Sequence, residues 1–574
     1  MYSYCFNFVT VRAIIITSFF LFTAENLLGQ ADMVPFFNLN SAVSVYDFLK
    51  TMRVKKIIAQ YNDDNINLSR GELSKLLDEI ESKRDLLSST EKILLERYKL
   101  TYREELIEDK ELSTVLIDGA ENFGYRLGDM FFSDKEKFFY FRRLSDKSTL
   151  FIDMMGNGTN PYQFSPNSGR TSMIWDGGFR ARGTLKGNLG YALAFYKGFL
   201  RGDRELMLLA RPILKANFKF VENIDAFASY DFTEGYIRYE TDPEEDFHLS
   251  VQFGREDIRY GLGYGSRLVW SGESPAPDML KFNLSYGALH YSQVHLSVPG
   301  DFSFNRLDNF TKYFAIHRVK LAFTELFDIG IGDIVVYSDR GIDFAYLNPF
   351  LFYKFAEQSL QDRDNGLMFF DIQTHFFKNL EFQATFLMDE TPDFGNINRF
   401  SNKWAYQIGA FLYEPFGLEN FSAVFEYTYI RPYVYTHWNP KNVYSSWGIG
   451  SGHRLQPNSD ELYARLNYNL SDRIRFQFEA ARSRHGRNRL APDGSILENV
   501  GGDIRVPYRP VDPENAPFLA GVLHRGVLLG GEITFEPWKN YLLNFRYQFR
   551  SDRNTETNAL EESSIFVFRF GFEY

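Results

Sequence analysis

The chain is almost free of cysteine. Its 574 residues contain a single one, Cys5, which precedes the first apolar stretch instead of following it. That order is wrong for a lipoprotein attachment site. Because Cys5 falls within a predicted export signal, we expect the mature chain to have no thiol, which excludes disulfides, thiolate metal sites and a cysteine nucleophile.

Long hydrophobic runs are absent after residue 24, and the mean hydropathy is only -0.30. A helical membrane protein of this length would show several apolar runs of ~20 residues. A transmembrane β-barrel shows none, because apolar and polar residues alternate along each of its strands. The composition therefore excludes a helical membrane protein and leaves a membrane barrel open.

Excess positive charge and catalytic motifs are also missing. The net charge is -11, which argues against a nucleic-acid partner. The sequence contains no nucleophile elbow, phosphate-binding loop or metal-binding histidine pair. We therefore predict a protein that is not an enzyme and that uses no cofactor and no metal.

The N-terminus carries a predicted export signal. Arg12 precedes an apolar stretch over residues 13–24, and the small-residue region around Gly29 and Ala31 follows it. The stretch is shorter than the ~20 residues of a membrane-spanning helix, so a cleaved signal peptide is favoured over an anchor. Residues 1–30 are assigned to this signal.

The C-terminal segment has the pattern of a membrane strand. Over residues 564–574, aromatic side chains alternate with Val567, Arg569, Gly571 and Glu573, and the last residue is Tyr574. A strand with aromatics on one face and charges on the other suits a barrel wall between lipid and water. A final strand ending in an aromatic residue also resembles the terminal signature of bacterial outer-membrane proteins.

Residues 31–110 are predicted to form a small helical domain on the periplasmic side. Ser69 with Glu72, and Ser88 with Glu91, each have the spacing of a capping box at a helix start. Apolar residues follow both boxes at intervals of three and four. The domain is either a solvated plug or cap, or a docking module for other envelope components.

Residues 111–574 are predicted to form the barrel itself. Period-two segments recur at 247–253, 280–286, 380–388, 421–429, 462–470 and 474–480. At roughly 25 residues per strand and its share of loops, about 460 residues give about 18 strands, and 16 is compatible with the same arithmetic. The fold class is thus a large transmembrane antiparallel β-barrel in the outer membrane of a Gram-negative type of cell.

Several sequence blocks resemble a known family. Residues 345–349 read Ala-Tyr-Leu-Asn-Pro and are followed by Asp364 and Asn365, while residues 452–460 run from Gly-His to Pro-Asn-Ser-Asp. Together they resemble the Wzi family of capsule assembly proteins. The resemblance implies a lectin-like barrel that binds or organises capsular polysaccharide or exopolysaccharide at the cell surface. Surface polysaccharide, outer-membrane lipid and periplasmic or capsule-export components are the partners it implies.

Two other functions stay open from the sequence. The predicted barrel is wide enough for a lumen, so a porin-like solute channel is one alternative. A structural envelope anchor that docks through the helical domain is the other. Conductance and polysaccharide binding would separate these functions.

The candidate site residues come from the family-like blocks and from nearby aromatics. Each is expected either to contact polysaccharide or to belong to a lumenal polar network or strand end. Proline cannot donate to a strand ladder, so the block before Pro349 is also expected to end a strand. The candidates are Tyr346, Asn348, Asp364, Asn365, Asp371, Tyr433, Tyr435, His437, Trp438, His453, Asn458 and Asp460.

Overall fold

The structure is a computed structural model. It describes residues 30–35, 41–107, 109–117, 128, 131, 133–145, 147–217, 220, 229–242, 246–301, 303, 305–323, 325–390 and 392–574. The predicted export signal, with Cys5, lies outside the described residues except for Gln30.

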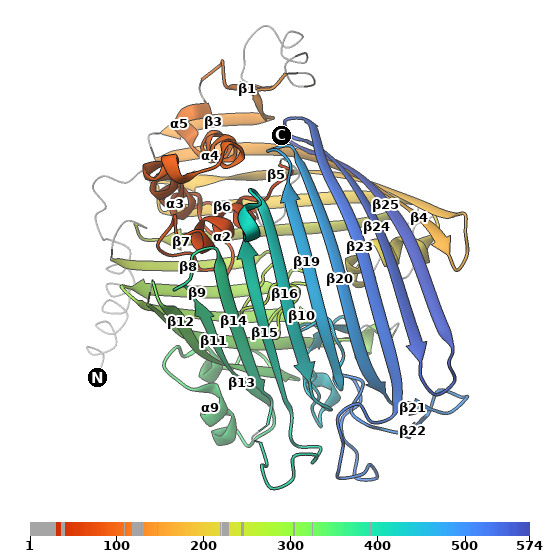
Figure 1. The fold of residues 1–574 in the computed structure, drawn as a ribbon. Helices are drawn as coiled ribbons and strands as arrows, with labels where there is room; N and C mark the ends of the chain where they lie inside the picture. Colours follow the sequence, from red (N-terminus) through yellow and green to blue (C-terminus); the bar gives the residue numbers. More distant parts are fainter. Residues whose placement is uncertain are drawn as a thin grey trace, which may run out of the picture.

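Eighteen of the described strands form a closed antiparallel barrel, as the sequence predicts (Figure 1). Neighbouring strands follow one another in the sequence, and pairing of β25 with β4 closes the wall. The wall strands are β4 (Ser148–Ser165), β5 (Arg170–Leu185), β6 (Leu189–Gly202), β7 (Ser229–Glu240), β8 (Phe247–Arg255), β9 (Asp278–Tyr286), β10 (Leu289–Pro299), β11 (Thr311–Phe323), β12 (Phe327–Ser338), β13 (Asn365–Thr374), β14 (Leu380–Met388), β15 (Trp404–Tyr413), β16 (Phe421–Ile430), β19 (Ser459–Asn469), β20 (Ile474–Arg487), β23 (Val522–Trp538), β24 (Tyr541–Asn554) and β25 (Leu560–Glu573).

Short strands and helices lie outside the wall or in its loops. β3 (Tyr140–Ser145) extends the sheet beside the start of β4, and β1 (Ser113–Val115) pairs with β2 (Glu136–Phe138). The loops contain α7 (Arg204–Ala210), η2 (Pro212–Ala216), η3 (Arg306–Asp308), η4 (Phe344–Leu347), α9 (Tyr353–Ser359), η5 (Pro415–Gly417), η6 (Pro440–Asn442), β17 (Ser445–Ser446), β18 (Ile449–Gly450), β21 (Arg489–Leu490) and β22 (Ile496–Glu498).

The two ends of the barrel differ in their connections. At one end the turns are short, as between β19 and β20 or β23 and β24, and the C-terminus lies there (Figure 1). At the other end, long segments such as 256–277, 431–458 and 488–521 connect the strands. Outer-membrane barrels have short periplasmic turns and longer extracellular loops, so the first end is periplasmic.

The outer face of the wall is apolar. On β6, β7 and β8 the side chains of Leu193, Ile237 and Phe253 are exposed, while alternate positions face the lumen. On β25 the aromatic residues also face outward, whereas Arg569 and Glu573 line the interior, as the alternation predicts. This belt of exposed apolar side chains identifies the face that contacts lipid.

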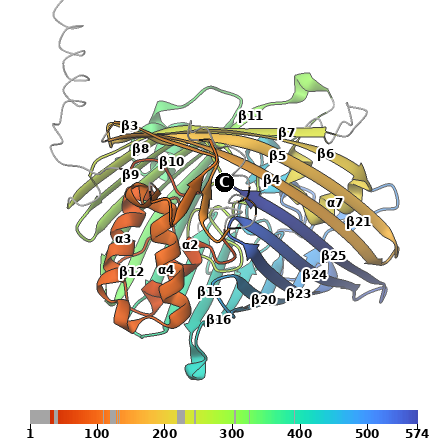
Figure 2. The ribbon, with the colours of Figure 1, turned by 90° about the horizontal axis from the view of Figure 1, so that it is seen from above.

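A small helical region covers the periplasmic mouth (Figure 2). It comprises α2 (Val45–Val54), α3 (Arg70–Ser82), η1 (Arg84–Leu86), α4 (Ser89–Tyr102) and α5 (Glu104–Ile107). Both predicted capping boxes are present, with Ser69 starting α3 and Ser88 starting α4. The helices share one buried apolar cluster, so the region has a core of its own.

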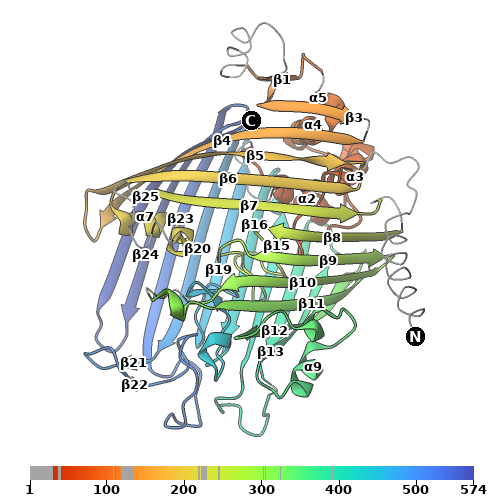
Figure 3. The same cartoon turned by 180° about the vertical axis from the view of Figure 1, so that it is seen from behind.

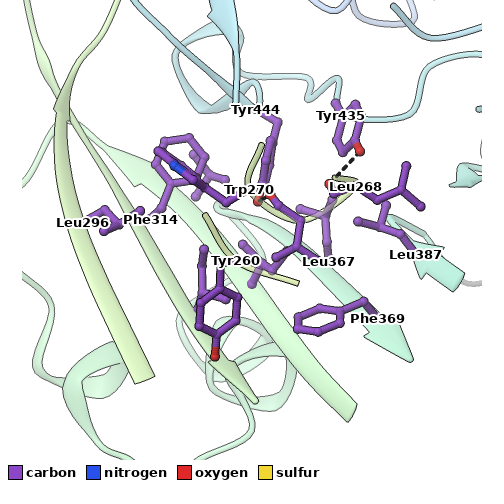
Figure 4. Packing of buried hydrophobic residues seen from close by; sticks show 14 of the residues in the cluster. Tyr260, Leu268, Trp270, Leu296, Phe314, Leu367, Phe369, Leu387, Tyr435 and Tyr444 are labelled. Carbon is purple, nitrogen blue, oxygen red and sulfur yellow. Dashed lines mark hydrogen bonds between the residues drawn. The ribbon is translucent and has the colours of Figure 1, made fainter. Parts of the chain in front are cut away.

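Two extracellular loops fold into the lumen and fill one side of it. Residues 256–277 and 431–458, called the plug here, pack against the inner faces of β10 to β16. Trp270 packs edge-on against Phe314 of β11, with ring centroids 5.1 Å apart, and Tyr444 packs on the same ring (Figure 4). Tyr435 Oη donates a 2.7 Å hydrogen bond to the carbonyl of Leu268, joining the two loops.

The plug also meets the helical region inside the barrel. The Gly261 amide donates to the carbonyl of Asp64 over 2.8 Å, and Asn65 forms a β-bridge with Tyr260. The Asp64 carboxylate accepts from Arg318 Nη1 at 2.6 Å and from Lys320 Nζ at 2.7 Å. Extracellular loop, wall and periplasmic helices are therefore held together in the middle of the lumen.

None of the described helices is long and apolar enough to cross a membrane.

Candidate functional site

A large cavity occupies the part of the lumen that the plug leaves free. Its volume is about 1360 Å³. It extends from Trp447 and Ile504 in the extracellular loops to Met33 and Asn67 near the periplasmic end. Its walls are the inner faces of β4 to β7 and β23 to β25 on one side and the plug on the other. Ligand sites measure about 300–1,000 Å³, so several sugar residues fit here.

Three arginines of neighbouring strands line one side of the cavity. Arg546 and Arg550 of β24 and Arg569 of β25 project into the lumen from positions that alternate with lipid-facing aromatics. Arg546 Nη2 donates to Glu479 Oε1 at 2.8 Å, and Arg569 Nη2 donates to the carbonyl of Ala210 at 3.3 Å. The exposed Arg550 forms no ion pair with any other residue that the structure describes, so its guanidinium is available to a ligand.

Acidic side chains line the cavity from β7 and from the plug. Glu234 of β7 faces the cavity together with Glu256, Asp257 and Glu273 of the plug. Burial raises the pKa of both Glu256 and Asp257 to about 7, against the lowering effects of a hydrogen bond from Gln252 and of nearby Arg259, respectively. Because both basic and acidic side chains line the cavity, it can bind polar groups of a ligand.

Half-buried aromatic side chains also line the cavity. Trp447 reaches it from the extracellular side of the plug, while Tyr196 and Phe232 reach it from β6 and β7. An aromatic ring offers an apolar face, and the tryptophan and tyrosine rings add a polar edge. Such faces can pack against the C–H face of a sugar ring while the charged walls bind its hydroxyl or acidic groups.

Among the predicted candidates, Tyr435 and His453 line this cavity from the plug side. The Tyr435 amide donates to Asp389 Oδ2 at 2.6 Å, and His453 Nδ1 accepts from the Leu455 amide at 3.2 Å. Burial lowers the pKa of His453 well below its ordinary value, so the ring is neutral. Both side chains hold the plug in shape and offer only part of their surface to a ligand.

Asn458 and Asp460 anchor the start of β19. Asn458 has a left-handed backbone (φ 58°), donates to the carbonyl of Gly486 at 2.9 Å and accepts from the Leu519 amide at 2.6 Å. Asp460 forms an ion pair with Arg484, and Tyr427 Oη donates to it at 3.0 Å. Neither residue lines the cavity.

Asn365 and Asp371 lie inside the barrel on β13. Asn365 Nδ2 donates to the carbonyl of Asn442 in the plug at 3.0 Å. Asp371 pairs with Arg318 at 2.5 Å, and Arg318 also contacts Asp64. They belong to polar networks that fix the plug and the helical region to the wall.

Tyr346, Asn348 and Asp364 lie outside the lumen. Tyr346 is buried against the outer face of the wall, where its ring contacts those of Tyr337 and Tyr353. Its hydroxyl donates to Asp364 Oδ2 at 2.7 Å, and Asn348 is exposed at the end of η4. The loop that contains them folds over the barrel instead of into it.

The remaining candidates lie in the outer part of the plug. Tyr433 is fully buried, and its hydroxyl donates to the carbonyl of Asn499 at 3.0 Å. His437 is buried, and burial lowers its pKa to about 4. Trp438 beside it is 66% exposed, so among these three it alone presents a large free surface.

The charged residues of the cavity walls were not among the candidates predicted from the sequence. Arg569 shows the signal that was available, since it falls on the polar face of the terminal strand. Arg546 and Arg550 repeat that pattern one strand earlier. Within the described ranges, no cluster of three or more histidine, cysteine, aspartate or glutamate side chains could hold a metal ion.

Comparisons with known proteins agree with this architecture. The family model of the capsule assembly protein Wzi matches residues 226–548. No curated protein sequence matches the chain. Among solved structures, Wzi of Escherichia coli, described as a carbohydrate-binding β-barrel involved in group 1 capsule assembly, has a TM-score of 0.53 at 12% identity, covering 95% of this chain and 99% of that one.

Two other solved structures are similar over a smaller part of the chain. OccAB2 of Acinetobacter baumannii has a TM-score of 0.43 at 11% identity and covers 75% of this chain and 98% of its own. OprD of Pseudomonas aeruginosa has a TM-score of 0.40 at 10% identity and covers 75% of this chain and 93% of its own.

Proposed function

The chain belongs to the family of the capsule assembly protein Wzi, and from this membership we propose that it binds or organises a capsular polysaccharide or exopolysaccharide at the cell surface. The protein is an outer-membrane barrel with surface polysaccharide as its proposed partner. The proposed function is binding, without a catalytic step.

The lumenal cavity is the observation that carries this proposal. It reaches the extracellular loops at Trp447, and it combines half-buried aromatics with charged walls. A polysaccharide offers the matching surface, namely apolar ring faces edged by hydroxyl or acidic groups. Arg550 and Trp447 are the proposed contacts, because an arginine binds carboxylate or hydroxyl oxygens and a tryptophan ring packs on a sugar face.

The test is binding of the detergent-folded protein to an array of bacterial surface polysaccharides. We expect Trp447→Ala to weaken binding of the preferred polymer about tenfold, which is ~1.4 kcal/mol. Trp438→Ala is the matched control, because Trp438 lies in the same loop but does not line the cavity. We expect the control to bind like the unmodified protein.

Two outcomes would contradict the proposal in different ways. Absence of binding to every polymer, together with clear conductance in a planar bilayer, would favour the porin-like function. Loss of binding in the Trp438→Ala variant and not in Trp447→Ala would move the polysaccharide site from the lumen to the outer surface of the loop.

A further inference from the structure

The outer wall carries polar side chains where lipid contact is expected. On β10, β11 and β12 the residues that face away from the plug include Gln293, His295, His317 and Asp333, and all four are buried. Nearer the periplasm, the same outer faces carry exposed apolar residues such as Leu321 and Ile329. Polar groups on the lipid face of a barrel are destabilising unless they are covered and hydrogen-bonded.

A loop covers this polar patch from outside. Residues 342–360, called the strap here, contain η4 and α9 and lie against the outer side of β12 and β13 (Figure 3). The Tyr353 amide donates to Asp333 Oδ2 at 2.6 Å, and Gln293 Nε2 donates to Tyr353 Oη at 2.6 Å. His317 Nε2 lies 2.7 Å from Asp333 Oδ1, so the Asp333 carboxylate is contacted both by the strap and by the neighbouring strand.

The strap is itself two-sided. Tyr346, Tyr353 and Glu357 are buried against the wall. Its opposite side presents phenylalanine side chains to the surroundings: Phe344 is 85% exposed, Phe350 91% and Phe355 68%. A protein surface in water rarely gathers so many exposed apolar side chains, so this side has an apolar partner.

The surrounding surface indicates what that partner is. Phe370 and Ile372, on the outer face of β13 beside α9, are exposed apolar residues of the lipid-contacting belt. The exposed side of the strap therefore continues an interface with lipid that the wall already forms. An amphipathic segment of this kind, apolar on one side, is suited to lie at the boundary between acyl chains and headgroups.

We infer that the strap lies in the outer leaflet of the outer membrane, with Phe344, Phe350 and Phe355 inserted among the acyl chains. The strap thereby has two roles. It shields the polar patch of β10 to β12 from lipid, and it fixes the extracellular half of the barrel at a defined depth in the leaflet.

The experiment places a single fluorescent reporter on the strap. In a Cys5→Ser background, Phe355→Cys is labelled with bimane and the full chain is reconstituted in vesicles with acyl chains that are either brominated or unmodified. Phe253→Cys, on the lipid face of β8, is the positive control, and Trp438→Cys, on the plug, is the water-exposed control. Folding of each variant is checked by its resistance to unfolding on an unheated gel.

We expect bromine to quench the label at position 355 by at least half of the quenching seen at position 253, and to leave position 438 nearly unchanged. Phe350→Cys serves as a second reporter if the first variant fails to fold. Quenching at 355 and 350 no stronger than at 438 would overturn the inference. Efficient cross-linking of Phe355→Cys between copies would also overturn it, by assigning this side to a second copy of the chain.

Discussion

Asp64 illustrates how single residues hold the plugged barrel together. It comes from the helical region, yet its carboxylate contacts Arg318 and Lys320 on β11, and Arg318 in turn contacts Asp371 on β13. Burial opposes ionisation of Asp64, but the two neighbouring cations outweigh it and hold its pKa well below the ordinary value. The carboxylate is therefore charged at neutral pH.

Substitution of this residue should be costly. We expect Asp64→Asn to lower the free energy of unfolding by about 3 kcal/mol, because it leaves two buried cations facing one carboxylate. Guanidinium unfolding of the reconstituted protein measures the change. Asp78→Asn, which removes an exposed ion pair with Arg103, is the control and should change stability by less than ~1 kcal/mol. Equal effects of the two substitutions would show that the buried network adds no more to the free energy of unfolding than an exposed ion pair does.

For single residues, the sequence indicated which ones belong to the family-like blocks, but it did not indicate whether each lies inside or outside the barrel. Tyr346 and Asp371 both belong to family-like blocks, yet one lies outside the wall and the other inside it. The direction in which a loop folds depends on long-range packing, which local patterns do not record. The cavity arginines lie on the polar faces of β24 and β25, but strand alternation alone does not show which lumenal residues line a cavity and which are covered by the plug.

Helix starts were the elements that the sequence predicted most sharply. Ser88 accepts from the Glu91 amide at 3.2 Å, and the Glu91 carboxylate accepts from the Ser88 amide at 2.6 Å. Both contacts are local, so a stretch of four residues suffices to predict them. Ser88 Oγ also donates to Asn420 in the turn before β16, which ties α4 to the barrel.

Removal of this cap should loosen α4. We expect Ser88→Ala to destabilise the helix by about 1 kcal/mol and to speed amide exchange in its first turn about fivefold. Hydrogen exchange followed by mass spectrometry measures this. Ser89→Ala, at the neighbouring exposed position, should leave exchange unchanged. Identical exchange in both variants would contradict a capping role for Ser88.

Strands could be predicted where one face of the wall contacts lipid and the other faces a polar lumen, because their residues then alternate between apolar and polar. The alternating segments at 247–253, 280–286, 380–388, 421–429 and 474–480 are confirmed as parts of β8, β9, β14, β16 and β20, and 462–470 overlaps β19, which ends at Asn469. β10 to β12 lack a clean alternation. Their inner faces carry apolar residues such as Leu296 and Phe314 against the plug, and their outer faces carry the polar patch under the strap.

For the whole molecule, the predicted barrel of about 18 strands with a helical region before it is confirmed. Length and strand spacing were enough for that prediction. Which loops fill the lumen was not predicted, because the plug rests on contacts between residues far apart in the sequence, such as Gly261 with Asp64. The division of the lumen into a filled side and a cavity follows from those contacts alone.

The plug should limit ion flow. We expect the unmodified protein to show little conductance in a planar bilayer, and replacement of residues 259–270 by a Gly-Ser linker to raise it severalfold. The control replaces residues 489–497, an exposed hairpin of the 488–521 loop, by a linker of the same kind and should leave conductance unchanged. A high conductance of the unmodified protein would show that the free side of the lumen is an open channel.

Closure of the wall by β4 and β25 has a consequence for how the protein is made. The amide of Tyr574 donates to the carbonyl of Met154, so the seam joins nearly the first and the very last residues of the barrel. Ring closure therefore waits until the last strand of the wall has been made, and the contact order is high. The contact between Asp64 and Gly261 lies inside the ring that this last pairing closes.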